Sequence, residues 1–287
     1  MNGFVLINKP CGVTSFSVTG KVRRALSVDK AGHAGTLDPI ATGVLPVMVG
    51  RATKLIDILP DEKKTYLAGF MLGMTTDTLD CEGDVLTEQP VNVTKEQIKS
   101  AIAHFTGKID QVPPMYSALS KNGVKLYQLA RKGIEVERKA RSITIFSNEL
   151  VSYDENTNIG IMRVCCSKGT YIRTLIDDIG MYLRCGAFMT TLTRESGSGF
   201  DIESCVPLED FLECPKKYFI DVENCLTQFP KVYVSDSQAK RFSNGGALNT
   251  ARCKLVGKSG IFRVYGNNAL IGLGEIVNDE LKLKWLK

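Results

Sequence analysis

Three runs rich in β-branched and aromatic residues place the strongest constraint on how this chain can fold. They cover residues 64–72, 143–146 and 161–166, and turn-forming residues bound each run. This is the pattern of β-strands. Between the first two runs, residues 94–105 combine a capping box with apolar residues at helical spacing, and a glycine follows, which predicts a surface helix. We therefore predict a mixed α+β fold built on a sizeable sheet.

A second unit is predicted near the end of the chain. Residues 204–230 contain three prolines and have the pattern of a helix followed by a connecting stretch. Beyond them, Ser235 and Gln238 form another capping box, and four short strands are predicted at 253–256, 261–265, 269–277 and 281–286. We therefore predict two domains, residues 1–228 and 229–287, the second a compact, mainly β, barrel-like module.

The charge of the chain is distributed unevenly. The net charge is +5, yet residues 229–287 hold ten Lys and Arg against four Asp and Glu, which leaves −1 for the rest. Residues 121–141 form another basic stretch, with seven Lys and Arg against two Glu. Two separate basic surfaces favour a polyanionic partner such as nucleic acid. For either stretch alone, a solvated face explains the pattern equally well.

Several classes of protein do not fit the composition. No run of eighteen apolar residues occurs, and the chain reaches Lys9 without a leader-like segment, so we expect a cytoplasmic protein with no membrane association. The nine cysteines form no C-x-x-C pair, and the two histidines, His33 and His104, lack the spacing of zinc ligands. We therefore expect reduced thiols and no metal site.

The most informative segment for function is residues 32–43, which read Gly-His-Ala-Gly-Thr-Leu-Asp-Pro-Ile-Ala-Thr-Gly. Its glycines allow the backbone to approach a ligand closely, and Asp38 is its one carboxylate. Asp followed by Pro is also the common pairing at a helix N-cap and first helical position. On pattern alone, the helix cap is the favoured interpretation of Asp38.

This segment resembles the catalytic loop of the TruB family of tRNA pseudouridine synthases. Further segments resemble the same family in the same order, at residues 7–10 with 12–15, 64–66, 76–80, 113–118 and 167–175. The resemblance covers residues 1–200, and the basic C-terminal module resembles a PUA RNA-binding domain more weakly. It implies a mixed, mainly antiparallel sheet with flanking helices and a cleft across its middle. It also implies that the protein converts uridine 55 in the T-arm of tRNA to pseudouridine, without a cofactor and without an obligate protein partner.

The resemblance assigns the chemistry to Asp38 and Arg173. Asp38 would be the nucleophile, attacking C1′ or C6 of the uridine or assisting removal of a sugar proton. Arg173 would pair with Asp38 and favour its ionised state. On pattern alone, an ion pair between Arg173 and Asp177, one helical turn away, is equally well supported.

Four further residues would bind the substrate according to the resemblance. Tyr66 would stack on the uracil, Tyr171 and Leu192 would line the base pocket, and His33 would help to displace the target nucleotide. Without the resemblance, the first three have the pattern of core residues. Asp80 matches a family acid by motif only and could equally cap a turn, so it stays outside the catalytic set.

The chain departs from the family pattern at one position, and two alternative functions stay open. Where the family usually has a lysine, this chain has Ser120 followed by Lys121, and Lys121 could substitute for it. If the missing charge normally contacts a phosphate, RNA affinity should fall slightly without changing the base that is selected. The protein could instead be an RNA-folding factor, a tRNA chaperone in which binding matters more than chemistry. It could also be directed by a guide RNA, although a chain that starts almost directly with the segment 4–10 favours a stand-alone enzyme.

Overall fold

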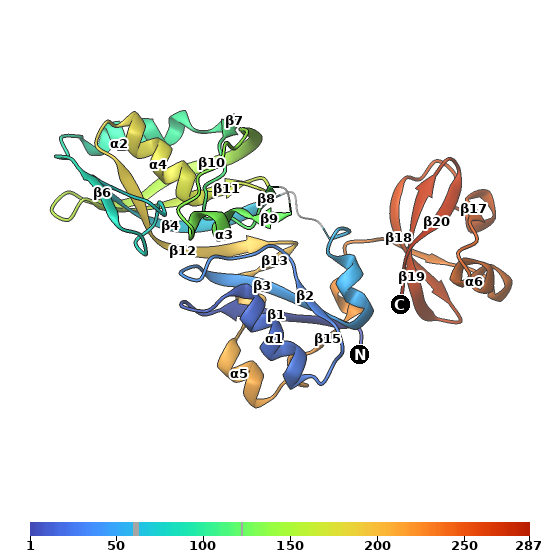
Figure 1. Ribbon diagram of the computed structural model, residues 1–287. Helices are drawn as coiled ribbons and strands as arrows, with labels where there is room; N and C mark the ends of the chain where they lie inside the picture. Colours follow the sequence, from blue (N-terminus) through green and yellow to red (C-terminus); the bar gives the residue numbers. More distant parts are fainter. Residues whose placement is uncertain (60–62, 122) are drawn as a thin grey trace.

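The predicted strands at 64–72, 143–146 and 161–166 lie side by side in one large sheet (Figure 1). The computed structural model describes residues 1–59, 63–121 and 123–287. The central strands run in the order β14-β1-β3-β12-β4-β11-β10-β7, with β2, β13 and β15 paired beside them. The pairs β1–β14 and β3–β12 are parallel and the other pairs are antiparallel. The mixed, mainly antiparallel sheet is thus confirmed.

The strands of this sheet are β1 (Gly3–Lys9), β2 (Ala31–His33), β3 (Thr42–Val49), β4 (Lys64–Leu72), β7 (Gly107–Gln111), β10 (Arg141–Asp154), β11 (Ile159–Cys166), β12 (Ala187–Gly197), β13 (Phe200–Asp201), β14 (Val206–Pro207) and β15 (Ile220–Asp221).

Helices pack against both halves of the sheet. In one half, α2 (Lys95–His104) and α4 (Ile172–Tyr182) bury their apolar residues against β4, β10 and β11. In the other, α1 (Ser15–Ala25) and α5 (Leu208–Glu213) pack against β1 and β3. The capping box predicted at Thr94 and Gln97 is present at the start of α2. Flanking helices therefore cover the sheet as expected.

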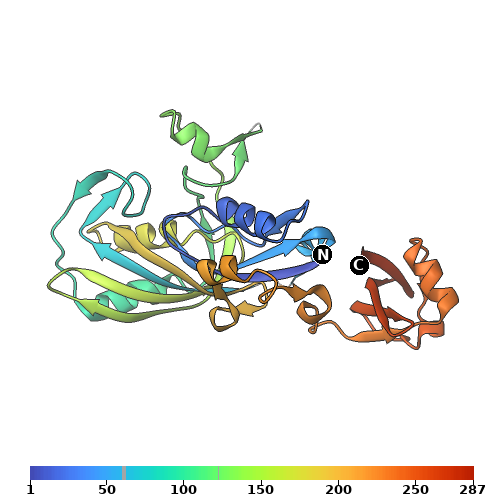
Figure 2. The same ribbon diagram turned by 90° about the horizontal axis from the view of Figure 1, so that it is seen from below.

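Short elements connect or extend this framework. The hairpin of β5 (Met74–Thr76) and β6 (Val85–Glu88) lies beside β12, and β8 (Ser120–Lys121) pairs with β9 (Val124–Lys125) before α3 (Leu126–Ala130). Figure 2 shows α3 rising from the body of the sheet. Three 3₁₀ turns also belong here: η1 (Gly50–Leu55), η2 (Ile202–Ser204) and η3 (Val222–Cys225). No helix within the described ranges is long and apolar enough to cross a membrane.

The end of the chain forms a separate, curled sheet in the order β16-β18-β19-β20-β17, with one helix (Figure 1). Its strands are β16 (Lys231–Tyr233), β17 (Leu248–Asn249), β18 (Gly260–Gly266), β19 (Ala269–Val277) and β20 (Glu280–Leu286), and its helix is α6 (Asp236–Ser243). The second capping box, Ser235 with Gln238, is present.

The strand predicted at 253–256 is wrong. The 3₁₀ turn η4 (Ala251–Cys253) occupies the start of this segment, and Lys254 has a left-handed backbone with φ of 56°. Cys253 and Leu255 are buried in the core of the module. The apolar pattern of this segment therefore reflects burial rather than strand pairing.

Candidate active site

The glycine-punctuated loop connects β2 to β3 and forms a tight turn at Asp38. The carbonyl of Asp38 accepts a hydrogen bond from the amide of Ala41 at 3.1 Å, and β3 begins at Thr42. The helix considered after Pro39 is wrong, because the chain pairs with β1 almost at once, from Gly43 onward. A turn uses the fixed φ of proline as readily as a helix start does.

Hydrogen bonds to buried groups fix this loop in place. The hydroxyl of Ser15 donates to the carbonyl of Leu37 at 3.0 Å and accepts from the amide of Leu37 at 2.9 Å. On the other side, the buried Lys9 donates from Nζ to three carbonyls, those of Pro10, Val13 and Pro39. The backbone on either side of Asp38 is therefore anchored, and the carboxylate is held in a defined position.

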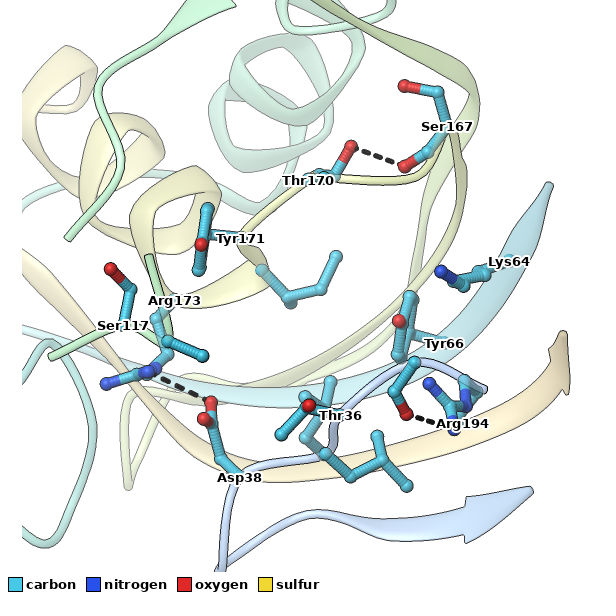
Figure 3. A pocket seen from close by; sticks show the side chains of 16 residues that line it. Thr36, Asp38, Lys64, Tyr66, Ser117, Ser167, Thr170, Tyr171, Arg173 and Arg194 are labelled. Carbon is cyan, nitrogen blue, oxygen red and sulfur yellow. Dashed lines mark hydrogen bonds and ion pairs between the residues drawn. The ribbon is translucent and has the colours of Figure 1, made fainter. Parts of the chain in front are cut away.

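Arg173 forms ion pairs with two carboxylates. Its Nη2 lies 3.0 Å from Oδ2 of Asp38, the pair drawn in Figure 3, and its Nη1 lies 3.2 Å from Oδ2 of Asp80. The guanidinium also donates to the carbonyls of Thr78 and Tyr116. The Arg173 side chain is 5% exposed, whereas that of Asp38 is 37% exposed. The predicted pairing with Asp38 is confirmed, and the alternative pairing with Asp177 is wrong.

Asp80 combines the two interpretations left open for it. It accepts a hydrogen bond from the hydroxyl of Thr78 at 2.6 Å and another from the amide of Glu82 at 3.1 Å, so it caps a turn. It is also buried against Arg173. Asp80 therefore helps to hold the guanidinium that faces Asp38.

Burial and charge act on Asp38 in opposite directions. Burial raises the pKa of Asp38 above its ordinary value, Arg173 and Lys9 lower it, and the neighbouring Asp80 raises it. Burial is the largest effect, so the net direction is upward. Burial also lowers the pKa of Lys9 to about 8. Arg173 favours the ionised carboxylate as expected, but it does not fully offset the cost of burial.

A cavity of about 280 Å³ opens beside Asp38, and Figure 3 shows its lining. Tyr66 on β4, Leu192 on β12, and Tyr171 and Arg173 at the start of α4 all line it. Five of the six predicted site residues therefore meet around one cavity. Its aromatic and apolar walls suit a planar ring, and its carboxylate faces a buried cation.

His33 lies in an adjoining cavity rather than in this one. That cavity has a volume of about 550 Å³ and shares Asp38 and Arg173 with the first. The imidazole Nδ1 lies 3.0 Å from the hydroxyl of Thr19, and Nε2 lies 3.4 Å from that of Thr36. Burial lowers the pKa of His33 below its ordinary value, so the ring is neutral at pH 7.

The chain matches two protein-family models, one in each part of the sequence. The family described as "TruB family pseudouridylate synthase (N terminal domain)" matches residues 23–172. The family described as "Pseudouridine synthase II TruB, C-terminal" matches residues 230–284. The chain belongs to the TruB family of pseudouridylate synthases.

Relatives of this TruB-family chain match it over essentially its whole length. Proteins named tRNA pseudouridine synthase B are 47% identical in Clostridium perfringens strain 13 and 46% identical in Clostridium kluyveri, each match covering 100% of this chain and 99% of the relative. A protein of the same name from Azoarcus sp. strain BH72 is 42% identical, over 100% of this chain and 95% of its own.

A solved structure has the same fold. The crystal structure of a Cbf5-Nop10-Gar1 complex contains a chain that matches with a TM-score of 0.74 and 26% identity, over 99% of this chain and 84% of its own. The similarity in fold therefore extends over both the large sheet and the C-terminal module.

Two charged residues that line the TruB-family cavity were absent from the predicted site. Lys64 precedes Tyr66 by two positions on β4, and Arg194 follows Leu192 by two on β12. Because side chains alternate across a strand, residues two apart lie on the same face. The predicted positions of Tyr66 and Leu192 therefore carried the signal that would have placed both cations in the cavity.

The described part of the chain has no cluster of metal ligands. Over residues 1–59, 63–121 and 123–287, no three or more His, Cys, Asp or Glu side chains are grouped so that they could hold a metal ion.

Proposed function

We propose that this protein isomerises uridine 55 in the T-arm of tRNA to pseudouridine, with Asp38 as the nucleophile. The observation that carries the proposal is the ion pair between Asp38 and the buried Arg173 at a cavity walled by Tyr66, Tyr171 and Leu192. Relatives 42–47% identical to this chain are named tRNA pseudouridine synthase B, which supports the choice of substrate.

The reaction requires one bond to break and another to form without net redox change. The bond between N1 of the uracil and C1′ breaks, the base turns, and C5 bonds to C1′. C5 then loses its proton and N1 gains one. An ionised Asp38 would start this sequence by attacking C1′ or C6, or by removing a sugar proton. Arg173 would hold the carboxylate in its ionised state and in position.

The cavity walls would retain the uracil while it is detached. Tyr66 is 7% exposed and contributes its ring to the cavity, where stacking on a base is worth about 1–3 kcal/mol. Tyr171 and Leu192 would complete the pocket and exclude water. His33, in the adjoining cavity, would occupy the stack that the flipped nucleotide leaves.

The two predicted domains would have different roles, catalysis and RNA binding. Residues 1–228 would carry the chemistry, and residues 229–287, with a net charge of +6, would act as a PUA-like module that binds the acceptor side of the tRNA. The tRNA would be the one macromolecule that the reaction requires, with no obligate protein partner. We propose that the protein acts on tRNA in the cytoplasm.

Replacing Asp38 by Asn tests the proposal. Asp38→Asn keeps the size of the side chain but removes the nucleophile, so pseudouridine formation at position 55 should fall by about a thousandfold or more. The affinity for tRNA should stay within about twofold, because the binding surfaces are unchanged. Mapping pseudouridine in tRNA and measuring binding by filter retention would give both quantities.

The matched control is Asp110→Asn, at an exposed position on β7, which should leave turnover unchanged. Wild-type turnover from the Asp38→Asn protein would contradict the assignment of the nucleophile. A wild-type protein that binds tRNA but forms no pseudouridine would instead support the RNA-folding factor.

A further inference from the structure

Two buried cations close one end of the active-site cavity. Lys64 and Arg194 both line it, and they are only 8% and 1% exposed. In Figure 3 they lie on one side of the cavity, beside Tyr66, and Asp38 with Arg173 lies on the other. Arg173 forms the ion pair with Asp38. The cavity therefore has a paired carboxylate at one end and two further cations at the other.

The loop that carries Asp38 brings these two cations together. A Cβ added at Gly35 would lie 3.1 Å from Nη1 of Arg194 and 3.4 Å from Nζ of Lys64. Arg194 is held in place because it donates from Nε to the carbonyl of Val44 at 2.7 Å and from Nη2 to that of Gly35 at 3.1 Å. Because position 35 has no side chain, both cations reach the wall of the cavity there.

Lys64 lies on the same face of β4 as Tyr66, the ring on which the uracil would stack. Residues two apart in a strand share a face and are about 7 Å apart, which is comparable to the width of a uracil with its carbonyl oxygens. The ammonium of Lys64 would therefore lie at the edge of a base that is stacked on Tyr66. The carboxylate of Asp38 would lie toward the sugar.

Uracil acquires negative charge on each of the routes considered for Asp38. If Asp38 attacks C1′ or removes a sugar proton, the bond between N1 and C1′ breaks and the uracil keeps its electron pair. If Asp38 attacks C6, the electron pair of the C5–C6 bond moves to O4. In either case the carbonyl oxygens of the base carry the charge until C5 bonds to C1′. A cavity with buried, largely apolar walls makes such a charge costly unless a cation is fixed beside it.

We propose that Lys64 is a further catalytic residue, whose ammonium donates a hydrogen bond to a carbonyl oxygen of the uracil and stabilises the negative charge on the base. This inference rests on the proposed function and assigns it a group that acts on the base rather than on the sugar. Lys64 keeps its proton throughout, and C5 still loses its proton and N1 gains one at the end. Arg194 adds positive potential at the same end of the cavity.

The test compares Lys64→Gln with the wild-type protein on two tRNAs, with uridine or 5-fluorouridine at position 55. Fluorine withdraws electrons, so the fluorinated base needs less help to carry the charge. In single turnover, the variant should convert uridine about a hundredfold more slowly, and 5-fluorouridine only about tenfold more slowly. Because C5 of the fluorinated base has no proton to lose, the assay follows the disappearance of the original nucleoside from position 55. The affinity for tRNA should stay within about twofold.

Two control variants separate charge from packing. Lys64→Arg keeps the charge and should slow the conversion of uridine by less than about tenfold. Lys63→Gln removes the charge of the preceding residue, which is exposed and lies 4.7 Å from the centre of the Phe146 ring, and it should leave both rates unchanged.

Three outcomes with Lys64→Gln would overturn the proposal. They are an unchanged rate with uridine, an equal loss with both nucleosides, and a loss of tRNA affinity with a smaller salt dependence, which would indicate a phosphate contact instead. If the wild-type protein leaves uridine 55 intact, the proposed function fails and this inference falls with it. An active wild-type protein with an equally active Lys64→Gln protein would overturn this inference alone.

Discussion

At the scale of single residues, the environment of Asp38 sets both its position and its acidity. The anchored turn fixes its backbone, and Arg173 orients its carboxylate from a buried position. Because burial raises the pKa of Asp38 while Arg173 and Lys9 lower it, ionisation of this carboxyl is sensitive to small changes in the surrounding charge. Removing the charge of the neighbouring Asp80 would change the pKa of Asp38 without altering Asp38 itself.

Replacing Asp80 by Asn should shift the pH dependence of the reaction. If the ionised form of Asp38 reacts, as proposed, kcat/KM should fall as the pH decreases through a pKa above the ordinary 3.8. Asp80 raises this pKa, and the neutral amide of the variant would remove that charge and leave Arg173 to pair with Asp38 alone. The acidic limb of the profile should therefore move to lower pH. Single-turnover rates across the pH range would measure it.

The control for this shift is again Asp110→Asn, whose profile should superimpose on that of the wild type. A limb that stays in place or moves to higher pH in Asp80→Asn would contradict the role given to Asp80.

At the scale of elements, local patterns predicted the strands and helices well but not the way in which the chain turns between them. The β-rich run at 64–72 coincides with β4, and both capping boxes are present. The same dipeptide, Asp38-Pro39, suits a helix start or a tight turn. The pairing of β3 with β1 decides between them, and that pairing is a long-range contact which no local pattern contains.

Buried cations were the part of the site that sequence patterns missed. A lysine or arginine in a strand usually faces solvent, so Lys64 and Arg194 taken alone gave no sign of burial. Only their two-residue spacing from Tyr66 and Leu192 indicated that they face the cavity. In the folded protein, Arg194 on β12 donates from Nε to the carbonyl of Val44 at 2.7 Å and from NH2 to that of Gly35 at 3.1 Å. It thereby connects the loop that carries Asp38 to β3, and this contact exists only once the strands have paired.

Replacing Arg194 by Met should loosen the catalytic loop. The carbonyls of Gly35 and Val44 would lose their donors, which should reduce the free energy of unfolding by about 2 kcal/mol or more. The turnover number should also fall, because Asp38 lies three residues beyond Gly35. Urea denaturation and single-turnover rates would measure the two effects.

The control is Thr191→Ala, at an exposed position on the same strand, which should change the free energy of unfolding by less than about 0.5 kcal/mol. Full activity in Arg194→Met would contradict the anchoring role.

At the scale of the whole molecule, the contact between the large sheet and the C-terminal module decides whether the two act together on one RNA. Figure 1 shows the module beside the end of the sheet at which the chain begins. One apolar cluster contains residues from both parts, with Phe4 and Leu55 on one side and Leu273 and Trp285 on the other. The module is thus fixed to the sheet by packing as well as by the covalent connection.

Replacing Trp285 by Ala should uncouple the two parts. The buried ring and its hydrogen bond to the carbonyl of Arg51 would be lost, at a cost of about 3–5 kcal/mol. The C-terminal module should then unfold before the large sheet, so calorimetry should show two transitions in place of one.

The control is Trp285→Phe, which keeps an aromatic ring and loses the hydrogen bond. It should lower the free energy of unfolding by only about 1 kcal/mol and keep a single transition. If the Ala variant also unfolds in one transition at the wild-type temperature, the cluster does not couple the parts.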